Sequence, residues 1–188
     1  MQKDSLKKKD KETSFENTKK ASAGKLKKFK KGTILQREGD KSLNVYIIEK
    51  GLLKSYVIDE KGKEHIFMFA SEGWIISDVE SHEFEHPAML FIECLEDCEL
   101  IVIKRSSLNW IMLDEKEKIK HLKLMHRRMS VMQRRLIMQM SYPAHERYEF
   151  FLTHYSSFLH RLSSKTIASF LGMTPETLSN VRSSMAKK

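Results

Sequence analysis

Residues 162–185, LSSKTIASFLGMTPETLSNVRSSM, decide the fold of the C-terminal part of the chain. Ser163 is a favourable helix N-cap, and the short helix that follows can end at Gly172, because glycine adopts the left-handed conformation that closes a helix. Thr174 is a second N-cap, followed by Pro175 as the first helical residue. Two short helices joined by a tight glycine turn predict a helix-turn-helix, whose second helix can enter the major groove of DNA.

The second helix has two different faces. Leu178 and Val181 face the first helix. The apolar side of the first helix consists of Ile167, Ala168 and Leu171. The outward side of the second helix consists of Glu176, Thr177, Ser179, Asn180 and Arg182. The alternative is a helical hairpin buried in a core, but burial would leave these polar groups without partners, so the pattern favours a helix that reads DNA.

These residues resemble a known motif. Ile167-Ala168, Leu171-Gly172 and Thr174-x-Glu-Thr-Leu-Ser-x-Val181 are similar to the helix-turn-helix of the Crp/Fnr transcription regulators. The resemblance implies a dimer that binds double-stranded DNA at an inverted repeat, with recognition helices in major grooves about 34 Å apart. It also implies RNA polymerase as a further candidate partner. The candidate DNA-contacting residues are Ser163, Ser164, Lys165, Thr174, Glu176, Thr177, Ser179, Asn180 and Arg182.

The expected base preference differs from that of the family. Glu176 can accept a hydrogen bond from cytosine N4, and Asn180 favours adenine. Contacts to the DNA backbone are assigned to Ser163, Ser164, Lys165 and Arg182. Other family members commonly have arginine where this chain has Pro175 and Asn180. The sequence also ends at Lys188, directly after the helix, so the family's β-hairpin wing is not expected.

Upstream, glycines recur about every ten residues between Gly32 and Gly73, with runs typical of β-strands between them. The expected strands are 33–37, 43–49, 52–58, 64–69, 74–77, 88–94 and 99–104. Short strands joined by turns such as Asp59-Glu-Lys-Gly62 predict an antiparallel barrel, roll or sandwich.

Several motifs in this region resemble the cyclic-nucleotide-binding β-roll of Crp/Fnr regulators. They are Phe29-Lys-Lys-Gly32, Arg37-Glu-Gly-Asp40, Tyr46-Ile-Ile-Glu-Lys-Gly-Leu-Leu53 and Leu95-Glu-Asp-Cys-Glu-Leu100. The combined resemblance covers residues 27–185. It implies an α+β chain with an N-terminal antiparallel β-roll, a long dimerisation helix and a C-terminal helix-turn-helix without a clear wing.

The family's cyclic-nucleotide members hold their ligand with a Gly-Glu pair and a later Arg-Ser/Thr-Ala, in which the arginine neutralises the phosphate and backbone amides complete an anion nest. The resemblance places Ser77-Asp78 and Ala88-Met89-Leu90 at these positions, so the effector-pocket candidates are Ser77, Asp78, Ala88 and Met89. The arginine is absent. Glu80, Glu83 and Glu85 would also repel an unpaired phosphate, at a cost of roughly several kcal/mol. We expect no binding of cyclic AMP or cyclic GMP, and either an apolar or cationic effector or a roll that serves only as a dimer scaffold.

A long helix is expected after the roll, with an acidic start at residues 114–117. Its apolar residues repeat with spacings of 3, 4, 3 and 4, and they are Leu122, Met125, Met129, Met132 and Leu136. This is the seam pattern of a two-stranded coiled coil, and flanking basic residues keep it narrow. The alternative is a single helix packed on the chain's own sheet. We predict a homodimer through this seam.

The charge is distributed unevenly. Residues 1–31 carry 12 lysines and four acids, whereas residues 32–113 carry eight basic and 15 acidic residues. The basic C-terminal half is expected to meet phosphate. The N-terminal block is interpreted as a solubility tail rather than a DNA-binding arm. The predicted domains are 1–26, a disordered basic tail; 27–113, the roll; 114–140, the dimerisation helix; and 141–188, the helix-turn-helix domain.

Other functions have little support in the sequence. Cys94 and Cys98 cannot supply the four thiolates of a cluster or structural zinc site, and we expect both to be reduced. His82 and His86 could bind a metal from a helix, but Pro87 favours a loop. No catalytic motif, signal peptide or membrane span is found, so we expect a cytoplasmic protein that is not an enzyme and has no metal or cofactor. The remaining alternative is a ligand-sensing or protein-interaction module that has lost specific DNA binding.

Overall fold

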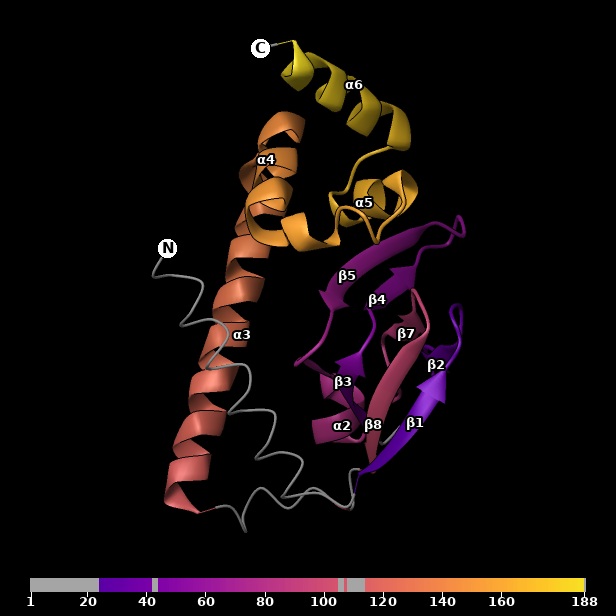
Figure 1. The fold of residues 1–188 in the computed structure, drawn as a ribbon, viewed down its shortest axis with the longest axis vertical. Coiled ribbons are helices and arrows are strands. Elements are labelled where there is room, and N and C mark those ends of the chain that lie inside the picture. Colours follow the sequence, from indigo (N-terminus) through magenta and orange to yellow (C-terminus); the bar gives the residue numbers. More distant parts are fainter. Residues whose placement is uncertain (1–23, 42–43, 105–106, 108–113, 188) are drawn as a thin grey trace. The chain divides into compact units, whose positions relative to one another are not determined.

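The computed structural model describes residues 24–41, 44–104, 107 and 114–187 (Figure 1). The chain divides into two compact units, Met1–Val57 with Phe69–His126, and Ile58–Met68 with Arg127–Lys188. The predicted α+β order is confirmed, since the strands of the described residues precede the long helix and short helices follow it. Predictions about residues 1–23, residues 108–113 and Lys188 lie outside the described residues.

The eight strands of the described residues form two four-stranded sheets. The first sheet has the order β1 (Lys25–Phe29), β8 (Cys98–Lys104), β3 (Asn44–Lys50) and β6 (Ile75–Ile76). The second has the order β2 (Ile34–Gln36), β7 (Phe91–Cys94), β4 (Leu53–Ile58) and β5 (Glu64–Ala70). Because consecutive strands mostly alternate between the sheets, the arrangement is a β-roll, which selects one of the three predicted all-β architectures.

Alternation along the strands builds the core of the roll. One face of the first sheet forms a buried cluster of Val45, Ile47, Ile75, Ile101 and Ile103, and Leu124 packs against it. On the other face of β3 and β8, Ile48 and Leu100 are fully buried. Residues one position apart therefore point into two different apolar layers, as a strand with a side-chain period of two requires.

The passage from β3 to β4 depends on a glycine. Gly51 has φ +114°, and a Cβ at this position would lie 2.4 Å from the Sγ of Cys98. Both the backbone conformation and the close approach exclude a side chain. Cys94 and Cys98 are buried free thiols, as expected for packing residues.

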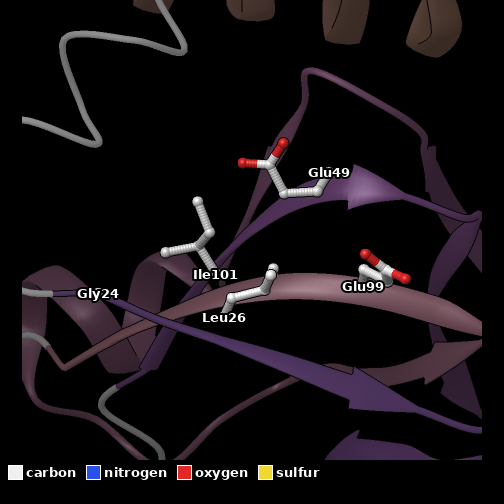
Figure 2. Close-up of a pocket in the computed structure, with 5 residues that line it drawn as sticks. All are labelled: Gly24, Leu26, Glu49, Glu99 and Ile101. Carbon is white, nitrogen blue, oxygen red and sulfur yellow. The ribbon is translucent and has the colours of Figure 1, made fainter.

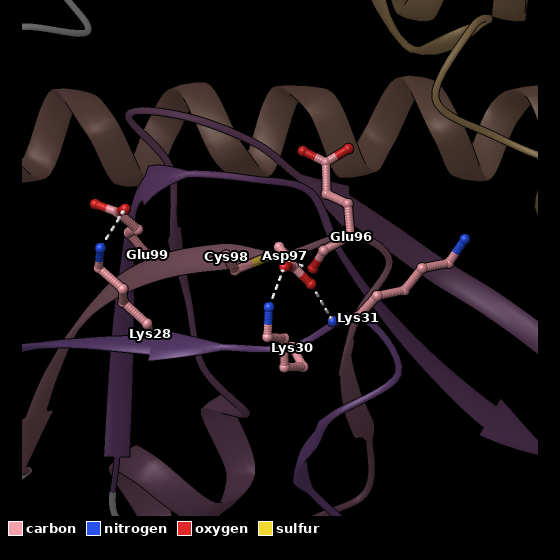
Figure 3. Close-up of polar contacts among 7 residues, drawn as sticks. All are labelled: Lys28, Lys30, Lys31, Glu96, Asp97, Cys98 and Glu99. Carbon is pink, nitrogen blue, oxygen red and sulfur yellow. Dashed lines mark hydrogen bonds and ion pairs between the residues drawn. The ribbon is translucent and has the colours of Figure 1, made fainter.

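The first strand was missed by sequence reasoning. β1 pairs with β8 from Lys25 onward, so the predicted end of the tail at residue 26 is two residues too late. Lys28 Nζ lies 3.3 Å from the Glu99 carboxylate, and Asp97 accepts hydrogen bonds from Lys30 Nζ at 2.8 Å and from the backbone N–H of Lys31 at 3.0 Å (Figure 3). Lys25, Lys27 and Lys28 belong to an edge strand, where such residues discourage pairing with another chain.

A short helix, α2 (Val79–Phe84), occupies a segment that was expected to be a loop. Asp78 is its N-cap, and Glu85 ends it with φ 60°. Pro87 lies beyond this end, where proline does not oppose a helix, so the loop prediction was wrong for residues 79–84. The strand expected from residue 88 begins only at Phe91.

The remaining helices are α3 (Glu115–Ser141), α4 (Ala144–Tyr155), η3 (Ser156–Phe158), α5 (Ser164–Phe170) and α6 (Pro175–Ala186). Pro143 is the N-cap of α4 and separates it from α3. An aromatic core supports the helix-turn-helix: the Phe170 ring lies edge-on to Phe151 and Tyr155, at centroid distances of 5.9 and 4.9 Å. Such pairs contribute packing and orient the rings that support α5.

Candidate nucleic-acid interface and effector segment

The turn between α5 and α6 has the geometry that its sequence predicts. The N–H of Gly172 donates to Ser169 O at 3.2 Å, and the N–H of Met173 donates to Ala168 O at 3.0 Å, which are the two bonds of a Schellman motif. Gly172 has φ +64°, and a Cβ there would lie 2.7 Å from Gln139 Oε1. The backbone conformation therefore favours glycine at this position, whereas the Gln139 side chain could move to make space.

Hydroxyl groups cap the starts of both helices. Ser163 Oγ accepts from the N–H of Thr166 at 3.1 Å, and Thr174 Oγ1 accepts from the N–H of Thr177 at 3.1 Å. Both N-cap predictions are confirmed. Local side-chain chemistry thus sets where α5 and α6 begin.

Two polar side chains hold the end of α5 and were missed by sequence reasoning. Gln139 Nε2 donates to Phe170 O at 2.9 Å, and Arg147 Nη1 donates to Leu171 O at 3.1 Å. Arg147 also donates to Gln139 O at 3.1 Å through Nη2. These bonds satisfy carbonyls that a helix end leaves open. The two bonds to α5 join residues 31 and 24 positions apart in sequence, so no local pattern could reveal them.

The outward face of α6 is polar and exposed. Leu178 is fully buried and Val181 is buried, whereas Glu176, Ser179 and Asn180 are exposed. Within the described part of the chain, the side chains of Ser179 and Asn180 have no hydrogen-bond partner. Ser183 is exposed one turn beyond Ser179 and was missed, although the four-residue spacing could have indicated it.

Glu176 is fixed as an anion at the start of α6. Hydrogen bonds from its own backbone N–H and from the Thr174 hydroxyl hold the pKa of this carboxyl below its usual range. Ionised at neutral pH, it can only accept hydrogen bonds, which is the property that recognition of a cytosine amino group requires.

Arg182 and Ser164, two of the predicted DNA-contacting residues, are hydrogen-bonded to each other inside the domain. Arg182 donates to Tyr148 Oη at 3.1 Å and to Ser164 Oγ at 2.9 Å, and its guanidinium lies 5.2 Å from the centre of the Tyr148 ring. These contacts join α6 to α4 and to the start of α5. Lys165 is exposed beside them. The structure therefore gives Arg182 a positioning role that its sequence pattern did not indicate.

The five predicted seam residues of α3 divide into two groups. Leu122, Met129 and Leu136 are 55–66% exposed. Met125 and Met132 are half-buried on the adjoining side. The outward stripe is extended by Ile119 and Met140, which are 47% and 77% exposed. The seven-residue steps from Leu122 to Met129 and Leu136 keep one face in line, so the apolar stripe runs along nearly the whole helix.

The predicted effector segment is built around a buried carboxylate. Asp78 is 3% exposed, and its Oδ2 accepts from the N–H groups of Met89 and Leu90, both at 2.8 Å. Its Oδ1 accepts from the N–H of Ser81 at 3.1 Å. Of the other three candidates, Ala88 is buried, Ser77 half-buried and Met89 exposed. The backbone amides of this segment therefore already bind an anion that belongs to the chain.

A cavity of about 460 Å³ lies elsewhere on the roll, lined by Gly24, Leu26, Glu49, Glu99 and Ile101 (Figure 2). Leu26 and Ile101 are paired across β1 and β8, so they share one face of the first sheet. None of the four predicted effector residues lines this cavity. The lining thus combines apolar side chains with two carboxylates, of which Glu99 is paired with Lys28.

Of the predicted histidine pair, the side chain of His82 lies outside the described residues. His86 Nδ1 lies 2.9 Å from the Glu80 carboxylate. Among the described residues, no group of three or more histidine, cysteine, aspartate or glutamate side chains could hold a metal ion. No helix described in the structure combines the length and apolarity needed to cross a membrane.

The sequence is similar to known regulatory proteins. Residues 26–115 match the cyclic nucleotide-binding domain family. An anaerobic regulatory protein of Haemophilus influenzae is 27% identical over 169 residues, which cover 82% of this chain and 64% of the relative. A protein of the same description from Aggregatibacter actinomycetemcomitans is 26% identical with the same coverage. The match thus spans 64% of the length of these curated relatives, which is slightly less than two thirds.

The fold is similar to solved structures of low sequence identity. FixK2 from Bradyrhizobium japonicum matches with a TM-score of 0.75 and 21% identity, over 88% of this chain and 85% of FixK2. TTHA1359, a transcriptional regulator of the CRP/FNR family from Thermus thermophilus, matches with a TM-score of 0.71 and 17% identity, over 87% and 86% of the two chains. Both curated relatives and TTHA1359 are described as regulatory proteins.

Proposed function

We propose that the chain is a DNA-binding transcription regulator of the Crp/Fnr type that acts in the cytoplasm as a homodimer on an inverted-repeat operator. The observation that carries the proposal is the exposed polar face of α6. Glu176, Ser179 and Asn180 lie outward on a helix whose other face is anchored by buried Leu178 and Val181. This arrangement suits insertion into a major groove, where polar side chains meet base edges.

The apolar stripe of α3 supports the dimer. Monomeric proteins rarely expose a long continuous line of large apolar side chains, and a second copy of α3 would bury this one. A two-fold axis along such a seam presents two copies of α6, so the bound DNA should have two-fold symmetry with half-sites one helical turn apart.

Selection of bound fragments from genomic DNA by the purified protein tests the function. We expect enrichment of an inverted repeat with half-site centres about 10 base pairs apart or a multiple of that spacing. Enrichment without symmetry would contradict the dimeric mode of binding. A pool that remains as diverse as the input would contradict specific DNA binding altogether.

Substitution of Asn180 should change which sequence is preferred. Asn180→Ala is expected to relax selection at one base position in each half-site, with a loss of about 1–3 kcal/mol for the preferred base. Lys165→Ala is the matched comparison, because an exposed lysine that contacts phosphate should weaken binding to all sequences alike and reduce the salt slope by about one. Fluorescence anisotropy over a panel of operator variants separates the two patterns. An unchanged base profile for Asn180→Ala would remove α6 from base reading.

The regulator is proposed not to respond to cyclic AMP or cyclic GMP. The Asp78 carboxylate occupies the amides of the predicted effector segment, and Ala88 stands where the family's resemblance places arginine. Isothermal titration calorimetry should therefore give no stoichiometric binding of either nucleotide at micromolar concentration. A one-to-one isotherm per protomer would overturn this part of the proposal.

The engagement of Arg182 favours one alternative function. This arginine is held by Tyr148 and Ser164, so α6 presents no outward arginine for a bidentate contact with guanine. A ligand-sensing or protein-interaction module without specific DNA binding would have this property. A gel-shift assay with random genomic fragments distinguishes the two functions, since only the regulator forms complexes that specific fragments displace.

A further inference from the structure

The tip of the β4–β5 hairpin belongs to the same compact unit as the helix-turn-helix. This unit contains Ile58–Met68 together with Arg127–Lys188. The turn is closed by Asp59, whose carboxylate accepts from the N–H groups of Lys61 and Lys63 at 2.9 Å each and lies 2.7 Å from His65 Nε2. The hydrogen bond to His65 and those from the backbone hold the pKa of Asp59 below its usual range. The tip is therefore an ordered turn rather than a loose loop.

Two side chains fasten this hairpin to α5. Ser169 Oγ donates to Glu64 O at 2.6 Å. Arg135 Nη2 donates to Ile66 O and, at 3.2 Å, to Phe170 O. One guanidinium group thus connects a backbone carbonyl of β5 with the last residue of the first helix of the helix-turn-helix.

The surroundings of Arg135 show that it is held in place. Its guanidinium lies 3.8 Å from the centre of the Phe170 ring, and Phe170 is fully buried. Burial lowers the pKa of Arg135 to about 10, which still leaves it charged at neutral pH. A charge that gives up water needs fixed partners, and here they are two carbonyls and an aromatic face. Lysine could keep the charge but not the planar, forked geometry.

We propose that the β4–β5 hairpin is a working part of the DNA-binding domain, with Arg135 and Ser169 as the positioning residues that fasten it to α5. The part of this proposal that involves DNA rests on the proposed function, whereas the attachment of the hairpin to α5 does not. Strands β4 and β5 belong to the second sheet of the roll, so the backbone is continuous from that sheet to the hairpin, and hydrogen bonds of Arg135 and Ser169 connect the hairpin to α5. Whatever orders α5 on the operator must also order the hairpin, and the effect is reciprocal because binding equilibria are linked.

Hydrogen exchange followed by mass spectrometry tests the fastening without DNA. In the full chain, Arg135→Lys and Ser169→Ala should each speed exchange in peptides covering both 58–68 and 164–171, by about tenfold where a bond to a buried carbonyl is lost. Arg134→Lys is the matched control, since Arg134 is exposed and donates to Ser130 Oγ within α3. Faster exchange of the hairpin alone, with α5 unchanged in both variants, would overturn the proposal.

A second measurement adds operator DNA. Binding should slow exchange of residues 58–68 in the wild-type chain, and the slowing should be lost in Arg135→Lys even at saturating DNA, whereas Arg134→Lys should behave as wild type. An operator that binds the wild-type chain and leaves the hairpin unchanged would contradict the linkage. If no DNA binds, the proposed function fails. Hydrogen exchange without DNA still tests whether Arg135 and Ser169 attach the hairpin to α5. Circular dichroism shows whether each variant folds. If one of Arg135→Lys and Ser169→Ala does not fold, hydrogen exchange of the other tests the proposal.

Discussion

Asp78→Ala is expected to lower the free energy of unfolding of the roll by about 3–5 kcal/mol, one of the two largest effects that the structure implies. The carboxylate accepts three backbone N–H groups from two separate segments and is 3% exposed. Removing it leaves three donors without a partner, and each hydrogen bond to a charged group contributes about 1.5–3 kcal/mol. Urea unfolding followed by tryptophan fluorescence measures the change.

Asp97→Ala is the control for this prediction. Asp97 also accepts hydrogen bonds, from the backbone N–H of Lys31 and from Lys30 Nζ. It is solvent-exposed, so its removal should change the urea midpoint far less. The urea midpoint of Asp78→Asn should lie between those of Asp78→Ala and Asp97→Ala. One oxygen of the asparagine remains an acceptor, while its NH₂ group cannot accept from the N–H groups of Met89 and Leu90. Equal midpoints for Asp78→Ala and Asp97→Ala would show that the buried carboxylate does not hold the segment together.

Asp78 also illustrates where sequence reasoning reached its limit. The resemblance placed it in an effector pocket, and the absence of arginine already argued against a phosphate ligand. The structure adds that the carboxylate itself fills the backbone amides. Its partners Met89 and Leu90 lie 11 and 12 residues away, across a helix that the sequence did not predict. Burial and long-range hydrogen bonds of this kind depend on tertiary structure, which no local pattern encodes.

The helix-turn-helix was predictable because its chemistry is local. Ser163 and Thr174 each cap a helix within three residues, and Gly172 closes the turn through residues no further than four positions away. By contrast, β1 was missed because its lysines resemble a solvated tail, while the pairing with β8 that makes it a strand spans more than 70 residues. The division of the α3 seam was likewise hidden, because only tertiary packing decides which side of an amphipathic helix faces inward.

The seam gives the second large effect. Met129→Asp should convert the dimer into a monomer and weaken operator binding by roughly two orders of magnitude or more, because two half-sites would no longer be bound together. Met129 is 66% exposed, so the change should leave the folded protomer intact. In a two-fold seam, however, it would place two carboxylates in an apolar contact without counter-charges, which is strongly unfavourable. Sedimentation equilibrium measures the association, and anisotropy with full and half operators measures the affinity.

Lys123→Asp is the control for the seam, because it changes the charge by two units at an exposed site of α3 that lies off the stripe of Leu122, Met129 and Leu136. It should leave the sedimentation profile dimeric, although it can alter the salt dependence of DNA binding. The half operator is equally informative, since a monomeric Met129→Asp chain with an intact α6 should bind it as the wild-type protomer does. A dimeric Met129→Asp chain would place the interface elsewhere, and loss of half-site binding would mean that α6 itself needs the dimer to be held in position.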